Sequence, residues 1–230
     1  MGEAVAQVLG RRGARIVLTW RSSKSAVEST AAKLQSQGIG VSTLQADLAQ
    51  PASIQQLIQS VESQFKRLDV IVNLASIYER TDSFKNPADA WDAHLTANSR
   101  SAYLLTLAAA PLLKKSGGGR VIHISDWTPA SGRPRYKEYS AYYASKAAIK
   151  AVTEALALEL APNILVNAIA PGPMIPPKGL TAEEDKAVRE ATPLGRWGGA
   201  EEIAKAVLFL VETDFVTGET LRVDGGRHLS

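Results

Sequence analysis

Short runs of apolar residues alternate with longer stretches in which apolar residues recur every three or four positions. Six short runs are rich in Val, Ile and Leu and predict strands: ARIVLTW, GVSTLQAD, LDVIVNLAS, GRVIHIS, NILVNAIAPG and ETLRVDGG. The longer stretches predict helices over 24–37, 50–66, 86–115, 139–161 and 199–213. Because the strands are apolar almost throughout, we expect a parallel sheet with helices on both faces. The pattern predicts a doubly wound, Rossmann-like α/β fold.

Composition narrows the class of protein. The 230 residues, 45% hydrophobic and 21% charged, suit a single domain over 1–230 with a full core. The formal charge of +3 comes from scattered Lys and Arg, so we expect neither nucleic acid nor a membrane as partner. The chain has no Cys, which excludes disulfides and thiolate metal sites and suits the cytoplasm. Its three histidines lie far apart, so we expect no metal site.

One short stretch, YSAYYASKAAI, carries candidate chemistry. Tyr142 and Lys146 are four residues apart and lie on one face of the predicted helix, with Tyr143 as the geometric rival. An ammonium beside a tyrosine favours the phenolate and lowers the tyrosine pKa, which would make it a usable acid or base. The same pattern also suits an ordinary amphipathic helix with a solvated lysine, so the pair needs context.

In doubly wound sheets the ligand lies beyond the carboxyl ends of the strands. The first predicted strand is followed by Arg21, Ser22 and Lys24, which offer charge and donors for the 2′-phosphate of NADPH where an NAD enzyme usually has an acidic residue. Asp47 and Asn73 follow the next two strands, where an adenine and its ribose could lie. Taken alone, Asp47 or Asn73 could instead be a helix cap or turn residue, and Arg21 could be a solvated loop residue.

The order of motifs along the chain is more specific than any single one. N-x-A-S, an asparagine in a helix, I-S-D, Y-x-x-x-K, P-G-P and a closing VTGETLRVDGG together resemble the short-chain dehydrogenase/reductase family over essentially the whole chain. The resemblance implies a proton-donating Tyr142, a Lys146 that binds the nicotinamide ribose and lowers the tyrosine pKa, and an Asn98 that supports a water relay. It implies an NADP-dependent oxidoreductase acting on a small molecule, assembled as a homodimer or homotetramer. The expected cofactor-binding set is Gly2, Arg21, Ser22, Asp47, Leu48, Asn73, Ala75, Lys146, Pro171 and Gly172.

Asp126 departs from the family pattern, which usually has serine there. A carboxylate only accepts hydrogen bonds, so it suits a substrate with N–H groups better than the developing oxyanion of a ketone. The aspartate and Tyr78 resemble the pteridine reductases of this family, which implies hydride transfer to a C=N bond of a pterin-like ring. A broad ketone or 3-oxoacyl reductase is the rival reading. The expected substrate contacts are Tyr78, Asp126, Tyr142 and Met174, and the segment 174–196 is expected to form a lid.

The N-terminus departs from the family as well. Gly2 matches the last glycine of the family's T-G-x-x-x-G-x-G turn, whose amides meet the cofactor pyrophosphate, and the preceding strand and glycines are missing. That strand is central in the family's sheet, so we expect a gap one strand wide. We expect the natural start to lie upstream or the chain to have been cut, and a sheet that has closed up differently is the remaining alternative. If Met1 is the true start, a non-catalytic binding or regulatory subunit becomes the alternative.

Overall fold

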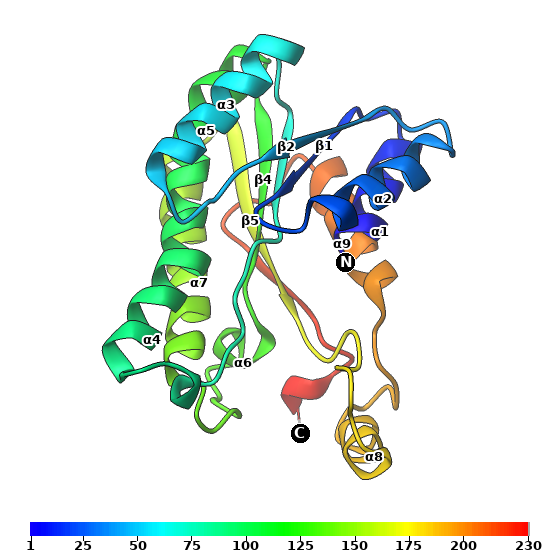
Figure 1. Cartoon of the computed structure of the whole chain (residues 1–230), viewed down its shortest axis with the longest axis vertical. Coiled ribbons are helices and arrows are strands. Elements are labelled where there is room, and N and C mark those ends of the chain that lie inside the picture. The colour runs from blue at the N-terminus through cyan, green and yellow to red at the C-terminus, as the bar shows by residue number, and fades with distance from the viewer. Residues whose placement is uncertain (230) are drawn as a thin grey trace.

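Parallel strands form the middle of three layers in the computed structural model, which describes residues 1–229 (Figure 1). The strands are β1 (Ile16–Trp20), β2 (Val41–Gln45), β3 (Val70–Asn73), β4 (Gly119–Ile124), β5 (Ile164–Pro171) and β6 (Thr220–Val223). The α-helices are α1 (Gly2–Arg11), α2 (Lys24–Gln35), α3 (Pro51–Phe65), α4 (Pro87–His94), α5 (Ser101–Lys115), α6 (Trp127–Ala130), α7 (Ser140–Leu160), α8 (Ala182–Glu190) and α9 (Ala200–Glu212). Shorter helical turns are η1 (Thr81–Ser83), the π-helix η2 (Leu95–Arg100) and η3 (Arg227–Leu229).

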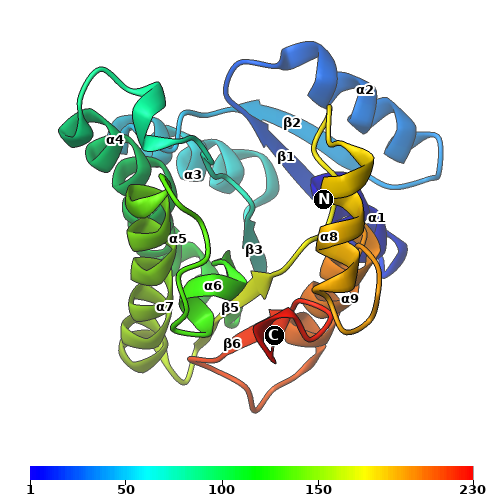
Figure 2. The same cartoon turned by 90° about the horizontal axis from the view of Figure 1, so that it is seen from below.

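Helices cover both faces of the strand layer, as the apolar strands predicted. Helices α3, α5 and α7 lie on one side, and α1, α2 and α9 lie on the other (Figures 1 and 2). Neighbouring residues of β4 point to opposite faces: Val121 packs with α5 and α7, whereas Ile122 packs with Val5 of α1 and Ile203 of α9. Each of these four side chains is fully or almost fully buried, which explains why apolar residues occupy both faces of the central strand β4.

The strands divide into two sheets. Strands β1 and β2 form one, and β3, β4, β5 and β6 form the other in that order, with every pair parallel. Across residues 1–229 no backbone ladder joins β1 to β3, so the expected gap is present. Apolar packing spans it instead, because Ile16 of β1 and Val72 of β3 both pack against the cluster that contains Val5 and Leu9 of α1.

Local differences from the sequence prediction have identifiable causes. The helix expected over 86–115 is interrupted by η2, where three side chains hydrogen-bond their own helix backbone or turn inward: Asn98, Ser99 and Ser101. Such π-turns are frequent at functional sites. Helices α6 and α8 were not expected, since each lacks an apolar stripe of its own and begins with a side-chain cap, Asp126 and Thr181 respectively. Within residues 1–229 no helix is both long and apolar enough to cross a membrane.

His123 of β4 lies in the core between two helices. Its ring nitrogens lie 3.0 Å from the hydroxyls of Thr106 in α5 and Thr153 in α7. Burial lowers its pKa from the ordinary 6.5 to about 4. Between these two pH values the unfolded chain binds more protons than the folded one, so stability falls as pH falls through this window.

We expect the free energy of unfolding to drop by roughly 3 kcal/mol from pH 6.5 to pH 4 through this residue. In His123→Gln, which cannot ionise, that part of the acid destabilisation should be absent. Urea unfolding at several pH values in this window measures it. An equal acid slope in both proteins would contradict the assignment.

Candidate active site

Asp126 stands at the carboxyl end of β4 and links two elements. One carboxylate oxygen, Oδ1, accepts hydrogen bonds from the backbone N–H of Thr128 (2.8 Å) and from its hydroxyl (2.7 Å), which caps α6. The other oxygen, Oδ2, accepts the hydroxyl proton of Tyr142 from α7 at 2.9 Å. The carboxylate is therefore fixed by the turn that it caps and is aimed at the tyrosine.

Lys146 lies one helical turn after Tyr142 and is only 1% exposed. Its ammonium donates to the carbonyl of Ile124 at 2.8 Å and lies 5.8 Å from the centre of the Tyr142 ring. Its own carbonyl accepts from the Ser125 hydroxyl at 2.8 Å, which ties α7 to the end of β4. Burial lowers the pKa of Lys146 to about 8, with the charge of Asp126 opposing that shift.

The pKa of Tyr142 differs from the sequence-based expectation. We expected Lys146 to lower it, whereas in the structure it is raised, first by burial and then by the negative charge and hydrogen bond of Asp126. The physical reason is that the tyrosine hydroxyl faces the carboxylate, while the ammonium bonds to a backbone carbonyl. The raised pKa keeps Tyr142 protonated at neutral pH, and it makes the hydroxyl a weaker acid than that of a free tyrosine.

The Asn98 side chain hydrogen-bonds Ile77 and Ser145 and not the Tyr142 hydroxyl. Its amide group donates to the Ser145 hydroxyl (2.9 Å) and to the carbonyl of Ile77 (3.2 Å), and its oxygen accepts from the Ile77 N–H (2.8 Å). The side chain thus joins η2, the loop after β3 and the face of α7 that carries Tyr142. The expected role in a water relay stays a prediction.

Aromatic rings form one wall beside Tyr142. The Tyr78 ring meets it edge-on at 4.7 Å between centres and stacks on Tyr139 at 4.6 Å. Tyr78 is 54% exposed, and burial of its remaining part raises its pKa to about 12. Of the three tyrosines in YSAYYASK, Tyr142 alone bonds Asp126, while Tyr139 belongs to this wall and Tyr143 is half-buried.

The other predicted binding residues lie at the carboxyl ends of the strands. Arg21 and Ser22 follow β1 and are exposed, and Asp47 and Leu48 follow β2. The Asp47 carboxylate accepts from the Ala49 N–H at 3.0 Å, and Asn73 accepts from the Ala75 N–H at 3.2 Å, so both side chains also cap turns. Pro171 ends β5, and Gly172 allows β5 to approach β6, because a Cβ there would lie 2.6 Å from Asp224.

Gly2 and Met174 are the two remaining predicted site residues. Gly2 begins α1, and a Cβ on it would lie 3.6 Å from Leu74, which directly follows β3. The start of α1 is thereby at the same edge as the strand ends. Met174 is only 7% exposed and packs in the apolar cluster under α9, with its sulfur and methyl group close to Gly198. Its role as a substrate contact is not supported by contact with Tyr142 or Asp126 and stays a prediction.

Comparisons with known proteins agree with this arrangement. A family model described as "Enoyl-(Acyl carrier protein) reductase" matches residues 1–228. The chain belongs to the short-chain dehydrogenase/reductase family. It is 33% identical over 233 residues to a 3-oxoacyl-[acyl-carrier-protein] reductase of Synechocystis, covering 98% of this chain and 92% of the relative. A "Short-chain type dehydrogenase/reductase" of Picea abies is 34% identical over 245 residues, covering 99% of this chain and 88% of the relative.

Solved structures of the short-chain dehydrogenase/reductase family share this fold. The Serratia marcescens short-chain dehydrogenase/reductase superposes with a TM-score of 0.89 at 31% identity, covering 99% of this chain and 93% of that one. An acetoin dehydrogenase from Enterobacter cloacae gives a TM-score of 0.86 at 33% identity, covering 99% and 91%. The chain is therefore an oxidoreductase of this family with a Rossmann-like α/β fold.

The side chains present fit both ends of the nicotinamide dinucleotide that this family uses. Lys146 has three ammonium N–H donors, and the carbonyl of Ile124 takes one of them, so a buried cation can also bind ribose hydroxyls. The exposed cation of Arg21 at the end of β1 suits the other half. At the pyrophosphate position, residues 1–229 supply the N-terminus of α1 and Gly2.

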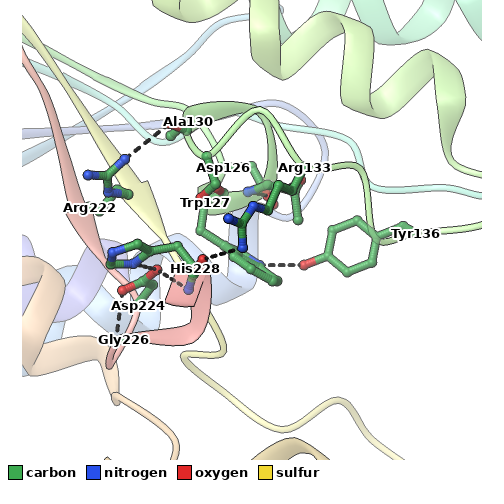
Figure 3. Close-up of polar contacts among 11 residues, drawn as sticks. Asp126, Trp127, Ala130, Arg133, Tyr136, Arg222, Asp224, Gly226 and His228 are labelled. Atoms are coloured by element: carbon green, nitrogen blue, oxygen red, sulfur yellow. Dashed lines mark hydrogen bonds and ion pairs between the residues drawn. The ribbon is translucent and has the colours of Figure 1, made fainter. Parts of the chain in front are cut away.

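Three residues beside the site were not identified from the sequence: Trp127, Tyr136 and Arg227. Trp127 directly follows Asp126 and donates from its indole N–H to the Tyr136 hydroxyl at 2.7 Å (Figure 3). Arg227 lies over the Trp127 ring at 5.8 Å. They come from two chain segments about ninety residues apart, so no spacing rule could group them. The only signal was their position after strand ends.

Proposed function

We propose that this protein is an NADPH-dependent reductase of carbonyl compounds, of ketone or 3-oxoacyl type. The observation that carries the proposal is the buried pair of Tyr142 and Lys146 on α7, held at the carboxyl end of β4 by the bond from Lys146 to the carbonyl of Ile124. The named 3-oxoacyl-[acyl-carrier-protein] reductases among its relatives support the substrate class.

Each residue has a distinct part in this reaction. A bound NADPH would supply the hydride, and Lys146 would hold its ribose near the tyrosine. Tyr142 keeps a proton on its hydroxyl at neutral pH and passes it to the oxygen of the reduced carbonyl. Asp126 orients that hydroxyl through the 2.9 Å hydrogen bond until a substrate oxygen takes its place as acceptor.

A second candidate is reduction of a C=N bond in a pterin-like ring, and Asp126 is the observation that favours it. An ionised carboxylate would accept from ring N–H groups, and Tyr78 offers a partly exposed ring for stacking. The same carboxylate would repel the developing oxyanion of a ketone. Asp126 therefore separates the two candidates.

Turnover of NADPH with matched substrates tests the function. We would compare dihydropterins with simple ketones and 3-oxoacyl thioesters, using wild type and Asp126→Ser. Carbonyl reduction that survives or rises in Asp126→Ser supports the lead proposal, since serine keeps the cap of α6 and adds a donor. Activity on dihydropterins that Asp126→Ser abolishes supports the second candidate. No turnover and no thermal stabilisation by NADPH would favour a non-catalytic binding subunit.

The preference for NADPH depends on Arg21. We expect NADPH to raise the melting temperature more than NADH, because a guanidinium forms charge-assisted bonds with the 2′-phosphate. Arg21→Glu should reverse that order, with a loss of NADPH affinity of about tenfold or more, since such bonds contribute roughly 1.5–3 kcal/mol. Thermal unfolding with each dinucleotide measures it. Lys114→Glu, which changes an exposed lysine near the end of α5, is the charge-matched control, and an unchanged order of the two dinucleotides in Arg21→Glu would contradict the role.

The segment 174–196 is proposed as a lid. Its helix α8 has no buried residue and is held by a few polar contacts, including the Trp197 indole N–H to Asp185 (2.7 Å) and the Leu194 N–H to the carbonyl of Gly225 (3.1 Å). We expect trypsin to cut at Lys178 and Lys186 several-fold more slowly when NADPH and substrate are bound. Equal cutting rates with and without the ligands would contradict closure of the lid.

We also propose that the protein assembles as a homodimer or homotetramer, which light scattering tests.

A further inference from the structure

The C-terminal segment is folded by the carboxylate of Asp224, which directly follows β6 and is 5% exposed. Its Oδ1 accepts a hydrogen bond from the Gly226 N–H at 3.0 Å. Its Oδ2 accepts from the His228 N–H at 3.1 Å and lies 2.7 Å from Nδ1 of the His228 ring. Because a carboxylate only accepts hydrogen bonds, Nδ1 is the donor in this pair. Both carboxylate oxygens thus hold the turn η3 beside the end of β6.

Two arginine side chains connect this segment to α6. Arg222 of β6 donates to the carbonyl of Ala130 at 3.2 Å, and Arg133, which follows α6, donates to the carbonyl of His228 at 3.2 Å (Figure 3). The partners in these bonds are 92 and 95 residues apart in sequence. The two bonds hold α6 against β6 and η3, which it contacts. We call the side chains of Arg133, Arg222, Asp224 and His228 the C-terminal anchor.

Helix α6 depends on such external support. It has only four residues, and a single helical turn is not stable by itself. Asp126 is its N-cap: Oδ1 accepts from the N–H of Thr128, and the backbone carbonyl accepts from the N–H of Ala130 at 3.2 Å. The orientation of the Asp126 carboxylate is therefore coupled to the position of α6. Its other oxygen accepts the Tyr142 hydroxyl at 2.9 Å, so a shift of α6 would move the partner of the proposed proton donor.

We propose that the C-terminal anchor positions Asp126 for the reaction, by holding α6 where the Asp126 carboxylate meets the Tyr142 hydroxyl. Arg133 and Arg222 are then positioning residues that act through α6, and Asp224 holds the turn that receives one of them. This inference rests on the proposed reductase function.

Loss of the anchor should lower kcat and leave the KM for NADPH unchanged. The expected split follows because the Lys146 ammonium, which would hold the cofactor ribose, bonds the Ile124 carbonyl at the end of β4 and not α6. A fold that was merely loosened would weaken cofactor binding as well.

The experiment replaces the two exposed arginines, which leaves no cavity in the core. In the double variant Arg133→Met, Arg222→Met (the methionine pair) neither side chain can donate a hydrogen bond, whereas in Arg133→Lys, Arg222→Lys (the lysine pair) both can. We expect the methionine pair to lower kcat for the best carbonyl substrate about tenfold, with a KM for NADPH within about twofold of wild type. The lysine pair should recover most of the lost kcat.

The charge-matched control is the double variant Arg12→Met, Arg67→Met. Both of these arginines are exposed and pair with acidic side chains outside the site, Glu212 at 3.0 Å and Asp69 at 2.6 Å. We expect this control to keep the kcat of wild type. An unchanged kcat in the methionine pair, or an equal loss in the control, would overturn the proposal while the reductase function stands.

Asp126→Ala tests whether the effect passes through Asp126, because this variant has no carboxylate to position. In the Asp126→Ala background the methionine pair should cause no further loss of kcat, since two changes that act through one group are not additive. A further loss as large as in wild type would show that the anchor acts by another route and would overturn the proposal.

Fluorescence of Trp127 tests the anchor even if wild type reduces no carbonyl compound and the reductase proposal fails. Trp127 lies in α6 and is 4% exposed. Subtracting the spectrum of the same protein with Trp127→Phe isolates its emission. We expect the methionine pair to shift this emission to longer wavelength, because a displaced α6 exposes the indole to water, and the lysine pair to restore it. Unchanged emission would show that α6 stays in place and would overturn the proposal.

Discussion

Replacing Tyr142 by phenylalanine is expected to lower reductase turnover by about 10²–10⁴-fold, the usual contribution of a general acid. The substitution removes only the hydroxyl that donates to Asp126, and the ring keeps its edge contact with Tyr78. The carboxylate retains both hydrogen bonds from Thr128, so we expect the loss of stability to stay near 1 kcal/mol.

Steady-state kinetics with the best carbonyl substrate measures this effect, and thermal unfolding with NADPH shows whether the cofactor still binds. Tyr143→Phe is the matched control, since its residue lies on the same helix and is half-buried. We expect that variant to keep its activity within a few-fold. Full activity in Tyr142→Phe would remove the assignment of the proton donor.

Replacing Lys146 by methionine is expected to abolish measurable activity and yet to stabilise the fold. The ammonium is almost fully buried and bonds one backbone carbonyl, and its pKa of about 8 lies well below the ordinary 10.5. The folded state therefore disfavours the charged form. At neutral pH we expect the free energy of unfolding to rise by roughly 3 kcal/mol when the charge is removed.

The pH dependence gives a second test with a definite sign. Between pH 8 and the ordinary pKa of 10.5, the unfolded chain binds more protons than the folded one, so wild-type stability rises with pH in this window. Urea unfolding from about pH 7.5 to about pH 9.5 should show a rise in wild type that is absent in Lys146→Met. The exposed Lys150, paired with Glu154 at 3.2 Å, provides the control Lys150→Met, which should change stability by less than about 0.5 kcal/mol. Lower stability in Lys146→Met than in this control would contradict the argument.

Several features of the site could be predicted from residue order. The i, i+4 spacing places Tyr142 and Lys146 on one helix face in any α-helix, and the strand ends collect Arg21, Asp47, Asn73 and Asp126 at one edge. The sequence could not predict that the pKa of Tyr142 is raised rather than lowered, because the direction of the shift depends on which group the hydroxyl faces. The cap of α6 fixes one oxygen of Asp126 locally, but burial and the packing that brings Tyr142 to the other oxygen depend on segments distant in sequence.

The sequence by itself determined the order of strands and helices, the two faces of the strand layer and the pairing of tyrosine with lysine, because these depend on period and spacing along one segment. Tertiary structure alone decided three further properties. It filled the gap between the two sheets with apolar packing around α1, gave Asn98 its bonds to Ile77 and Ser145, and brought Arg227 against Trp127. Contacts of this kind join segments that are distant in sequence, and their geometry is set by how the whole chain buries its apolar surface.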